Sequence, residues 1–187
     1  MSTKILKVVT DGSLTRSKGC HPVWQSGILI LDQDNIVQKY LTLIGKGNFW
    51  LTSNAVEYNS VYWGVHTATQ LIRSLGTLSK CKDYQIHLYA DSQLIVQQLR
   101  KVYATKKQQF LKIQKDILKY CRYYKEIHMY WHRRNTDLAV IADYASKADE
   151  NDVRALFLKY GGLDVDLLSQ EIHKKLLLEE MEQTQSK

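Results

Sequence analysis

Residues 5–13 read ILKVVTDGS, an apolar and β-branched run that stops at an acid, a glycine and a serine. Such a run predicts a buried strand over residues 5–10, and the Asp-Gly-Ser that follows is typical of a turn. Asp11 would then end the strand. An acid in that place is either a turn residue or a functional side chain, and the rest of the sequence has to decide between the two.

Four further stretches have the pattern of strands. Residues 26–31 (SGILIL) and 36–44 are separated by the turn residues DQDN, which predicts an antiparallel hairpin. Residues 84–90 (YQIHLYA) alternate in polarity and end at Asp91, and residues 126–131 form a fifth strand. Asp91 therefore ends a strand in the same way as Asp11.

Helices are expected between and after these strands. Thr52 and Ser53 are good N-cap residues for a long helix that Gly76 would stop after Leu75. Glu57 lies on the apolar stripe of this helix, so it faces inward, where an acid needs a partner or a function. Further helices are expected over residues 92–99, 106–123 and 139–148.

The order of these elements predicts an α/β fold with a mixed five-stranded sheet, three antiparallel strands and then two parallel ones, flanked by helices. We assign residues 1–149 to one domain. We assign residues 150–187 to a C-terminal helical extension with Val165, Leu168, Ile172 and Leu176 along one side. Packing on the core, self-association and binding of a protein partner remain open for this extension.

The amino-acid composition of the chain favours some classes of binding partner over others. The chain of 187 residues has 26 Lys and Arg against 19 Asp and Glu, a formal net charge of +7 that favours a polyanion such as nucleic acid. The three cysteines lie far apart without zinc-site spacing, which fits a reducing compartment. Since no apolar run is long enough to span a membrane, we expect a cytoplasmic protein without a membrane partner.

Four acids occupy related places: Asp11 and Asp91 at strand ends, Glu57 early in the long helix, and Asp143 in the first turn of the alanine-rich helix. Adjacent strand ends and two helices would bring them together, and four close carboxylates need cations. Hard oxygen ligands suit Mg²⁺ or Mn²⁺, and two such ions about 4 Å apart serve phosphoryl displacement. Asp137 competes with Asp143 for the fourth position.

Four motifs in order, TDGS (10–13), TSNAVE (52–57), ADSQLIV (90–96) and ADYASKA (142–148), resemble those of type 1 ribonuclease H. The resemblance covers residues 5–148. It implies an endonuclease that hydrolyses the RNA strand of RNA/DNA hybrids with two Mg²⁺ or Mn²⁺ ions. The products would carry 5′-phosphate and 3′-hydroxyl ends.

The resemblance also implies individual roles for the acids. Asp11 would bridge both metals, and Asp143 would complete the site of the metal that activates water. Glu57 and Asp91 would hold the metal that stabilises the leaving 3′ oxygen.

Polar residues of the same motifs would bind the hybrid. Thr52 resembles the residue that contacts a phosphate of the DNA strand, although capping also explains it. Contacts with the minor groove or backbone are implied for Ser13, Asn54, Ser92 and Gln93. Arg133 and Arg134 are our candidates for phosphate contacts. A basic face or a merely solvated helix surface is formed by Lys101, Lys106, Lys107, Lys112 and Lys115.

The chain departs from the family pattern before its last acid. His132 is a tentative catalytic residue, because some relatives carry a loop histidine there, but the extra residues 136–141 leave the alignment open. Two other functions remain as alternatives. One is another nuclease of the same fold, resembling a junction resolvase, and the other is a non-catalytic module that binds nucleic acid.

Overall fold

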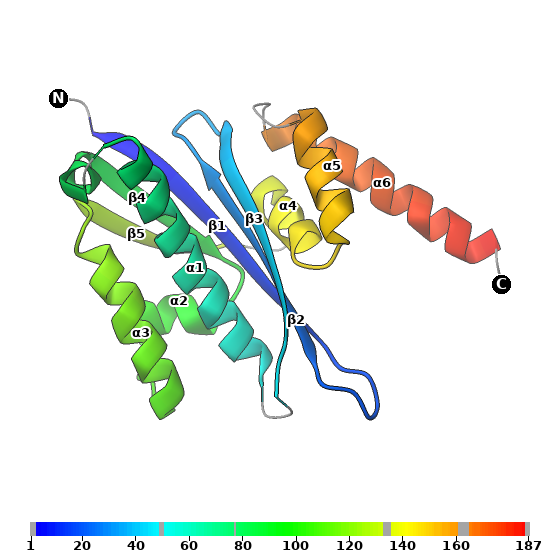
Figure 1. The fold of residues 1–187 in the computed structure, drawn as a ribbon, viewed down its shortest axis with the longest axis horizontal. Helices are drawn as coiled ribbons and strands as arrows, with labels where there is room; N and C mark the ends of the chain where they lie inside the picture. The colour runs from blue at the N-terminus through cyan, green and yellow to red at the C-terminus, as the bar shows by residue number, and fades with distance from the viewer. Residues whose placement is uncertain (1–2, 49–50, 77, 133–135, 161–164, 186–187) are drawn as a thin grey trace.

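The computed structural model describes residues 3–48, 51–76, 78–132, 136–160 and 165–185. Its centre is a five-stranded sheet in the order β3-β2-β1-β4-β5 (Figure 1). β1, β2 and β3 pair antiparallel, whereas β4 and β5 run parallel to β1. The predicted α/β fold class is therefore confirmed. The strands are β1 (Lys4–Thr15), β2 (Val23–Leu31), β3 (Val37–Lys46), β4 (Tyr84–Ala90) and β5 (Glu126–Trp131).

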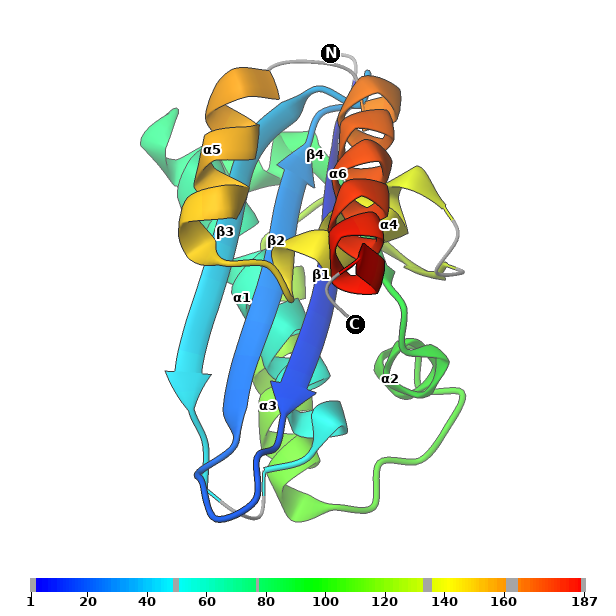
Figure 2. The ribbon, with the colours of Figure 1, turned by 90° about the vertical axis from the view of Figure 1, so that its right-hand side faces the viewer.

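Helices cover both faces of the sheet (Figures 1 and 2). One face carries α1 (Ser53–Ser74), α2 (Gln93–Leu99) and α3 (Gln108–Cys121), with a short 3-10 helix, η1 (Leu78–Asp83), between α1 and β4. The other carries α4 (Asp137–Ala145), α5 (Glu150–Tyr160) and α6 (Val165–Gln185). Among the helices of the described segments, none combines the length and the apolar character that a bilayer crossing requires.

The sheet separates two apolar cores. On one face, Val8, Ile28 and Leu88 pack under α1, α2 and α3. On the other, Val9 and Leu29 pack against α4 and α6. The buried side chains that α5 and α6 add to this second core are Val153, Val165, Leu168 and Ile172. The first half of α6 thus packs on the core, which is one of the three possibilities left open above, whereas Leu176, predicted on the same side, is exposed. The helix α5 was not predicted from the sequence.

The first strand is longer than predicted. We expected it to end at Asp11, but β1 runs to Thr15 because its last residues stay paired with β2. Its pairing with β4, in contrast, ends where Thr10 lies opposite Ala90. Asp11 is therefore the first residue of β1 beyond the end of β4. Because β4 no longer pairs with β1 at this point, side chains from the helices on both faces of the sheet can approach Asp11.

Glycines let helices approach the strands closely on both faces. A Cβ at Gly64 of α1 would lie 2.7 Å from Cγ2 of Thr10 and 2.9 Å from Cγ1 of Val8. A Cβ at Gly27 of β2 would lie 2.4 Å from the carbonyl oxygen of Ala142 in α4. Gly27 is the β2 partner of Asp11, so the close approach of α4 occurs beside that acid.

The contact at Gly27 gives a first prediction. Gly27→Ala is expected to lower the free energy of unfolding by about 3 kcal/mol, because the added methyl meets helix backbone, which cannot turn away as a side chain can. Urea denaturation measures this loss. A variant as stable as the parent protein would contradict the close approach of α4.

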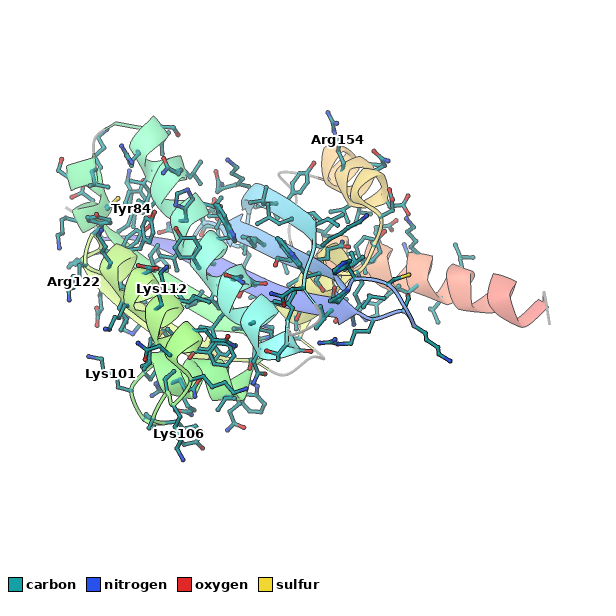
Figure 3. All side chains as sticks on the ribbon, turned by 60° about the horizontal axis from the view of Figure 1, so that its bottom comes forward. Tyr84, Lys101, Lys106, Lys112, Arg122 and Arg154 are labelled. Atoms are coloured by element: carbon teal, nitrogen blue, oxygen red, sulfur yellow. The ribbon has the colours of Figure 1, made fainter. Side chains whose placement is uncertain are left out.

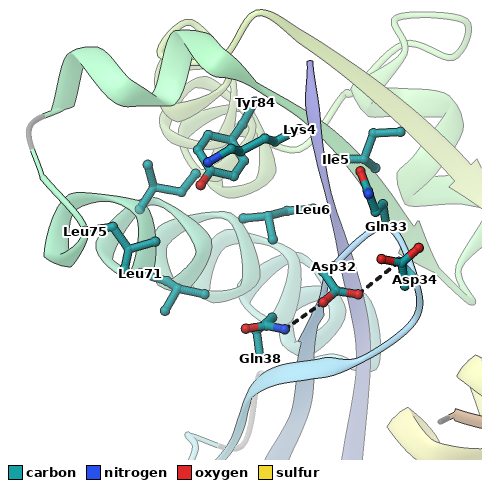
Figure 4. A pocket seen from close by; sticks show the side chains of 11 residues that line it. Lys4, Ile5, Leu6, Asp32, Gln33, Asp34, Gln38, Leu71, Leu75 and Tyr84 are labelled. Carbon is teal, nitrogen blue, oxygen red and sulfur yellow. Dashed lines mark hydrogen bonds between the residues drawn. The ribbon is translucent and has the colours of Figure 1, made fainter. Parts of the chain in front are cut away.

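A pocket lies at the end of β1 that is far from Asp11 (Figure 4). Leu6, Leu71 and Leu75 form its apolar wall, and the β2–β3 turn forms its polar rim. The Asp32 carboxylate accepts hydrogen bonds from the main-chain N–H of Asp34 (2.9 Å) and from Nε2 of Gln38 (2.8 Å). Asp32 therefore acts as a turn residue, as the DQDN pattern predicts.

Candidate active site

Asp11 is the most buried of the four candidate acids, with 7% of its surface exposed. Its carboxylate lies on the α4 side of the sheet. There the hydroxyl of Ser146 donates a hydrogen bond to Oδ2 of Asp11. The main-chain N–H of Gly12 also donates to this carboxylate. Asp11 is thus held in place by α4 and by its own strand.

Together with Asp11, Glu57 and Asp91 line one narrow cavity, which in this structure has no room for a water molecule. Glu57 stands in the first turns of α1, and its Oε2 atom has no solvent exposure, as its place on the apolar stripe predicts. Asp91 follows β4 directly, and the indole Nε1 of Trp131 donates to its main-chain carbonyl oxygen (2.9 Å). Gly12 contributes to the assembly, because a Cβ there would lie 3.1 Å from the main-chain nitrogen of Glu57.

Asp143 approaches Asp11 from α4, which lies on the opposite face of the sheet from α1. The prediction that it lies in the first turn of its helix was wrong: α4 begins at Asp137, with Thr136 as its N-cap, so Asp143 lies in the second turn. The hydroxyl of Thr136 accepts from the N–H of Ala139 (3.3 Å), which explains the earlier start. Asp143 is partly exposed, and its Oδ1 atom forms an ion pair with Lys147 at 2.5 Å.

The electrostatics of Asp11 link this carboxyl group to Asp91 and Asp143. Burial raises the pKa of Asp11 above its ordinary value, the hydrogen bond from Ser146 opposes this rise, and the charges of Asp91 and Asp143 add to it. A carboxyl group that two other carboxylates perturb is a feature of functional sites. Asp137 instead faces α6, where its Oδ1 atom accepts a hydrogen bond from Ser169 (2.8 Å).

The donor atoms of this cluster fit a hard divalent cation. All four candidate ligands are carboxylates, which Mg²⁺ and Mn²⁺ prefer and which need positive charge when they are crowded. Within the described residues, no three His, Cys, Asp or Glu side chains already stand close enough to ligate one ion together. Ser146 and Lys147 instead engage oxygens of Asp11 and Asp143. An ion would therefore draw the carboxylates together.

Five of the predicted hybrid-binding residues fall within the described part of the chain. Thr52 caps α1, its hydroxyl accepting from Ala55 N–H at 3.3 Å, which confirms the capping explanation. Ser92 is the N-cap residue of α2 and lines the cavity of the acids. Asn54 is half-buried in the first turn of α1, and Gln93 is exposed at the start of α2. Ser13 donates instead to the carbonyl oxygen of Ser146.

His132 lies outside the residues that line the cavity of the acids. It follows β5, is 9% exposed, and donates its main-chain N–H to the carbonyl oxygen of Ala90 (3.3 Å). Both ring nitrogens are shielded from solvent, so a catalytic role would require the imidazole to turn outward. Arg133 and Arg134, our candidates for phosphate contacts, lie outside the described residues.

Sequence reasoning missed Ser146 and Lys147. Both lie in the motif ADYASKA, three and four residues after Asp143, where a helix brings side chains to the same side. That spacing could have indicated the Lys147 ion pair. The contact between Ser146 and Asp11 joins residues 135 positions apart and depends on how α4 is seated on the sheet.

The sheet order, the helical layers and the position of the acids define the ribonuclease H-like fold. LC11-RNase H1, from a compost metagenome and solved with an RNA/DNA hybrid, superposes with a TM-score of 0.63 at 17% identity; 80% of this chain and 99% of that chain are covered. The N-terminal RNase H domain of Rv2228c from Mycobacterium tuberculosis, solved as a fusion with maltose-binding protein, gives 0.60 at 19% identity, covering 90% of this chain and 98% of that one.

A viral protein shares the fold as well. The foamy virus protease-reverse transcriptase, solved with an RNA/DNA hybrid, matches with a TM-score of 0.57 at 11% identity over 78% of this chain and 19% of that chain. No family model and no curated protein matches the sequence. At such identities the likeness establishes the fold, and function has to be argued from the site.

Proposed function

We propose that this protein is a ribonuclease H, an endonuclease that hydrolyses the RNA strand of RNA/DNA hybrids. The observation that carries the proposal is the meeting of Asp11, Glu57 and Asp91 around one cavity, with Asp143 close enough to raise the pKa of Asp11. These acids come from β1, α1, the end of β4 and α4. Four carboxylates gathered from four elements serve no evident purpose in packing.

Asp11, Glu57, Asp91 and Asp143 are the residues that would hold two Mg²⁺ or Mn²⁺ ions. When bound, these ions supply a water nucleophile at neutral pH and stabilise charge on the leaving 3′ oxygen. Asp11, central and buried, would be shared between the two ions, with Asp143 on the water side and Glu57 and Asp91 on the leaving-group side. The products would carry 5′-phosphate and 3′-hydroxyl ends.

The choice of a hybrid as substrate rests on the motif residues and on two neighbours. LC11-RNase H1 and the foamy virus enzyme were both solved with an RNA/DNA hybrid. A hybrid presents 2′-hydroxyls on one strand only, in a wide minor groove. Polar groups beside the acids, such as Ser92, Gln93 and Asn54, would contact that groove and restrict cleavage to RNA.

A cleavage assay tests the proposal. A labelled RNA/DNA hybrid is incubated with the protein and Mg²⁺ or Mn²⁺, beside RNA/RNA, DNA/DNA and single-stranded controls. We expect cuts in the RNA of the hybrid only, with 5′-phosphate ends that a phosphatase can remove. Cleavage of the DNA duplex would point to another nuclease of this fold. Hybrid binding without any product would point to a non-catalytic module.

The α2–α3 region supplies a candidate surface for the nucleic-acid backbone. Lys101 and Lys106 in the α2–α3 connection and Lys112 on α3 are exposed and project from the same end of the molecule (Figure 3). We infer that this basic face contacts phosphates of the hybrid.

Replacing the basic face should weaken binding in a salt-dependent way. Lys106→Ala with Lys112→Ala is expected to raise the dissociation constant for the hybrid. It should also reduce the slope of log K against log salt by about 1 per lost contact. Fluorescence anisotropy in Ca²⁺ across a salt series measures both quantities. Arg154→Ala on α5, across the sheet, is the matched control (Figure 3). An equal loss of hybrid affinity in the double lysine variant and in Arg154→Ala would show that this basic face does not contact the hybrid.

A further inference from the structure

Ser146 has a position that neither helix capping nor core packing fully explains. It is the C-cap residue of α4, with no exposed surface, and its hydroxyl donates to Oδ2 of Asp11. The other acceptor in reach of the hydroxyl is the carbonyl oxygen of Asp143 at 2.9 Å. One hydroxyl has one hydrogen, and an ionised carboxylate is the stronger acceptor. An ionised Asp11 therefore takes it.

The strands hold this serine in a fixed place. Nε2 of Gln25 donates to the carbonyl oxygens of Ala145 (3.1 Å) and Ala148 (2.7 Å), at the end of α4. Ser13 donates to the carbonyl oxygen of Ser146 itself. These bonds use the carbonyl groups that a helix end leaves without partners. They fix the helix end against β1 and β2.

Close packing also fixes the end of α4 against the sheet. A Cβ at Gly27, opposite Asp11 in the sheet, would lie 2.7 Å from the main-chain nitrogen of Ser146. The helix end thus rests directly on β2, and the serine hydroxyl has little freedom to leave Asp11. The same helix also carries Asp143. It therefore brings two groups to the candidate site: the carboxylate of Asp143, which is a candidate ligand, and the hydroxyl of Ser146, which holds the carboxylate of Asp11.

We propose that Ser146 is a positioning residue that orients the carboxylate of Asp11 for divalent cation binding. This inference rests on the proposed function. The hydroxyl engages one oxygen of Asp11 and fixes the plane of the carboxylate, so that its rotation is restricted before an ion arrives. Hydrogen-bonding partners of ligating carboxylates are typically worth 10- to 100-fold in metal affinity.

Manganese binding to the intact protein, without substrate, tests the proposal. We expect Ser146→Ala to raise the Mn²⁺ dissociation constant roughly 10- to 100-fold in titrations followed by electron paramagnetic resonance. Gln25→Ala is the matched control, because it removes two hydrogen bonds from the same helix end without touching an acid. It should lower Mn²⁺ affinity much less than Ser146→Ala does, because the bond from Ser13 and the close packing at Gly27 still hold the helix end. Urea denaturation of both variants reports how far each loosens α4.

Three results would overturn the inference. Unchanged Mn²⁺ affinity in Ser146→Ala would show that the hydroxyl does not position Asp11. Equal loss of affinity in Ser146→Ala and Gln25→Ala would show that Ser146 acts only by seating α4. If the parent protein neither binds Mn²⁺ nor cuts a hybrid, the proposed function fails as well, which the first two results do not imply.

Discussion

Asp91→Asn is expected to abolish cleavage of the hybrid, with a loss of at least about 100-fold in rate. Asn has the same size as Asp but carries no charge, so it cannot replace a carboxylate that neutralises a divalent cation. The main chain at this position is held by the bond from Trp131 to the Asp91 carbonyl oxygen, which the substitution leaves intact. The fold should therefore survive while the chemistry is lost.

Single-turnover cleavage of a labelled hybrid, with circular dichroism and urea denaturation of each protein, measures the effect. Asp116→Asn on α3 is the matched control, because it removes an exposed acid that does not line the cavity of Asp11 and Asp91. It should cut at the parent rate. If Asp91→Asn still cuts within a few-fold of the parent, the assignment of the cavity as the active site is wrong.

The sequence predicted the five strands and most of the helices because each has a strong local pattern, whereas α5 was not predicted. Alternating or continuous apolar runs marked all five strands, and Thr52 marked the start of α1. The full extent to which β1 pairs with its neighbouring strands was harder to predict. Asp11-Gly12-Ser13 has the composition of a turn, yet residues 11–15 pair with β2, because tertiary pairing outweighs local preference. The same acid therefore stands inside a strand, at the step beside β4.

The candidate site was predictable in its residue types and only partly in its contacts. The four acids followed from their places in the chain and from the family motifs. The bond between Ser146 and Asp11 could not follow, since it depends on the close approach of α4 at Gly27. The helix α4 also begins two residues before the predicted start at Ala139, because the hydroxyl of Thr136 caps it.

Asp11→Asn is expected to abolish cleavage and, in metal-free buffer at neutral pH, to raise the stability of the protein. Burial, opposed by Ser146 and reinforced by Asp91 and Asp143, raises the pKa of Asp11 in the folded state. The folded protein then binds the proton more tightly than the unfolded chain, so stability falls as pH rises from the ordinary pKa of 3.8 to the raised value. Asn cannot titrate, and this loss should disappear.

Thermal denaturation in chelator from pH 3.5 to 8 measures the difference. Below the ordinary pKa of Asp11 the two proteins should have similar melting temperatures, and the gap should open as the pH rises. Saturating Mg²⁺ or Mn²⁺ should reverse the order. An ion at 100 times its dissociation constant stabilises the parent by about 2.7 kcal/mol, whereas the variant lacks the shared ligand. Parallel curves in chelator, or equal stabilisation of both proteins by metal, would show that Asp11 is not the buried centre of a metal site. A gap that opens as the pH rises and is reversed by metal would mean that the buried carboxylate of Asp11 destabilises the fold until an ion is bound.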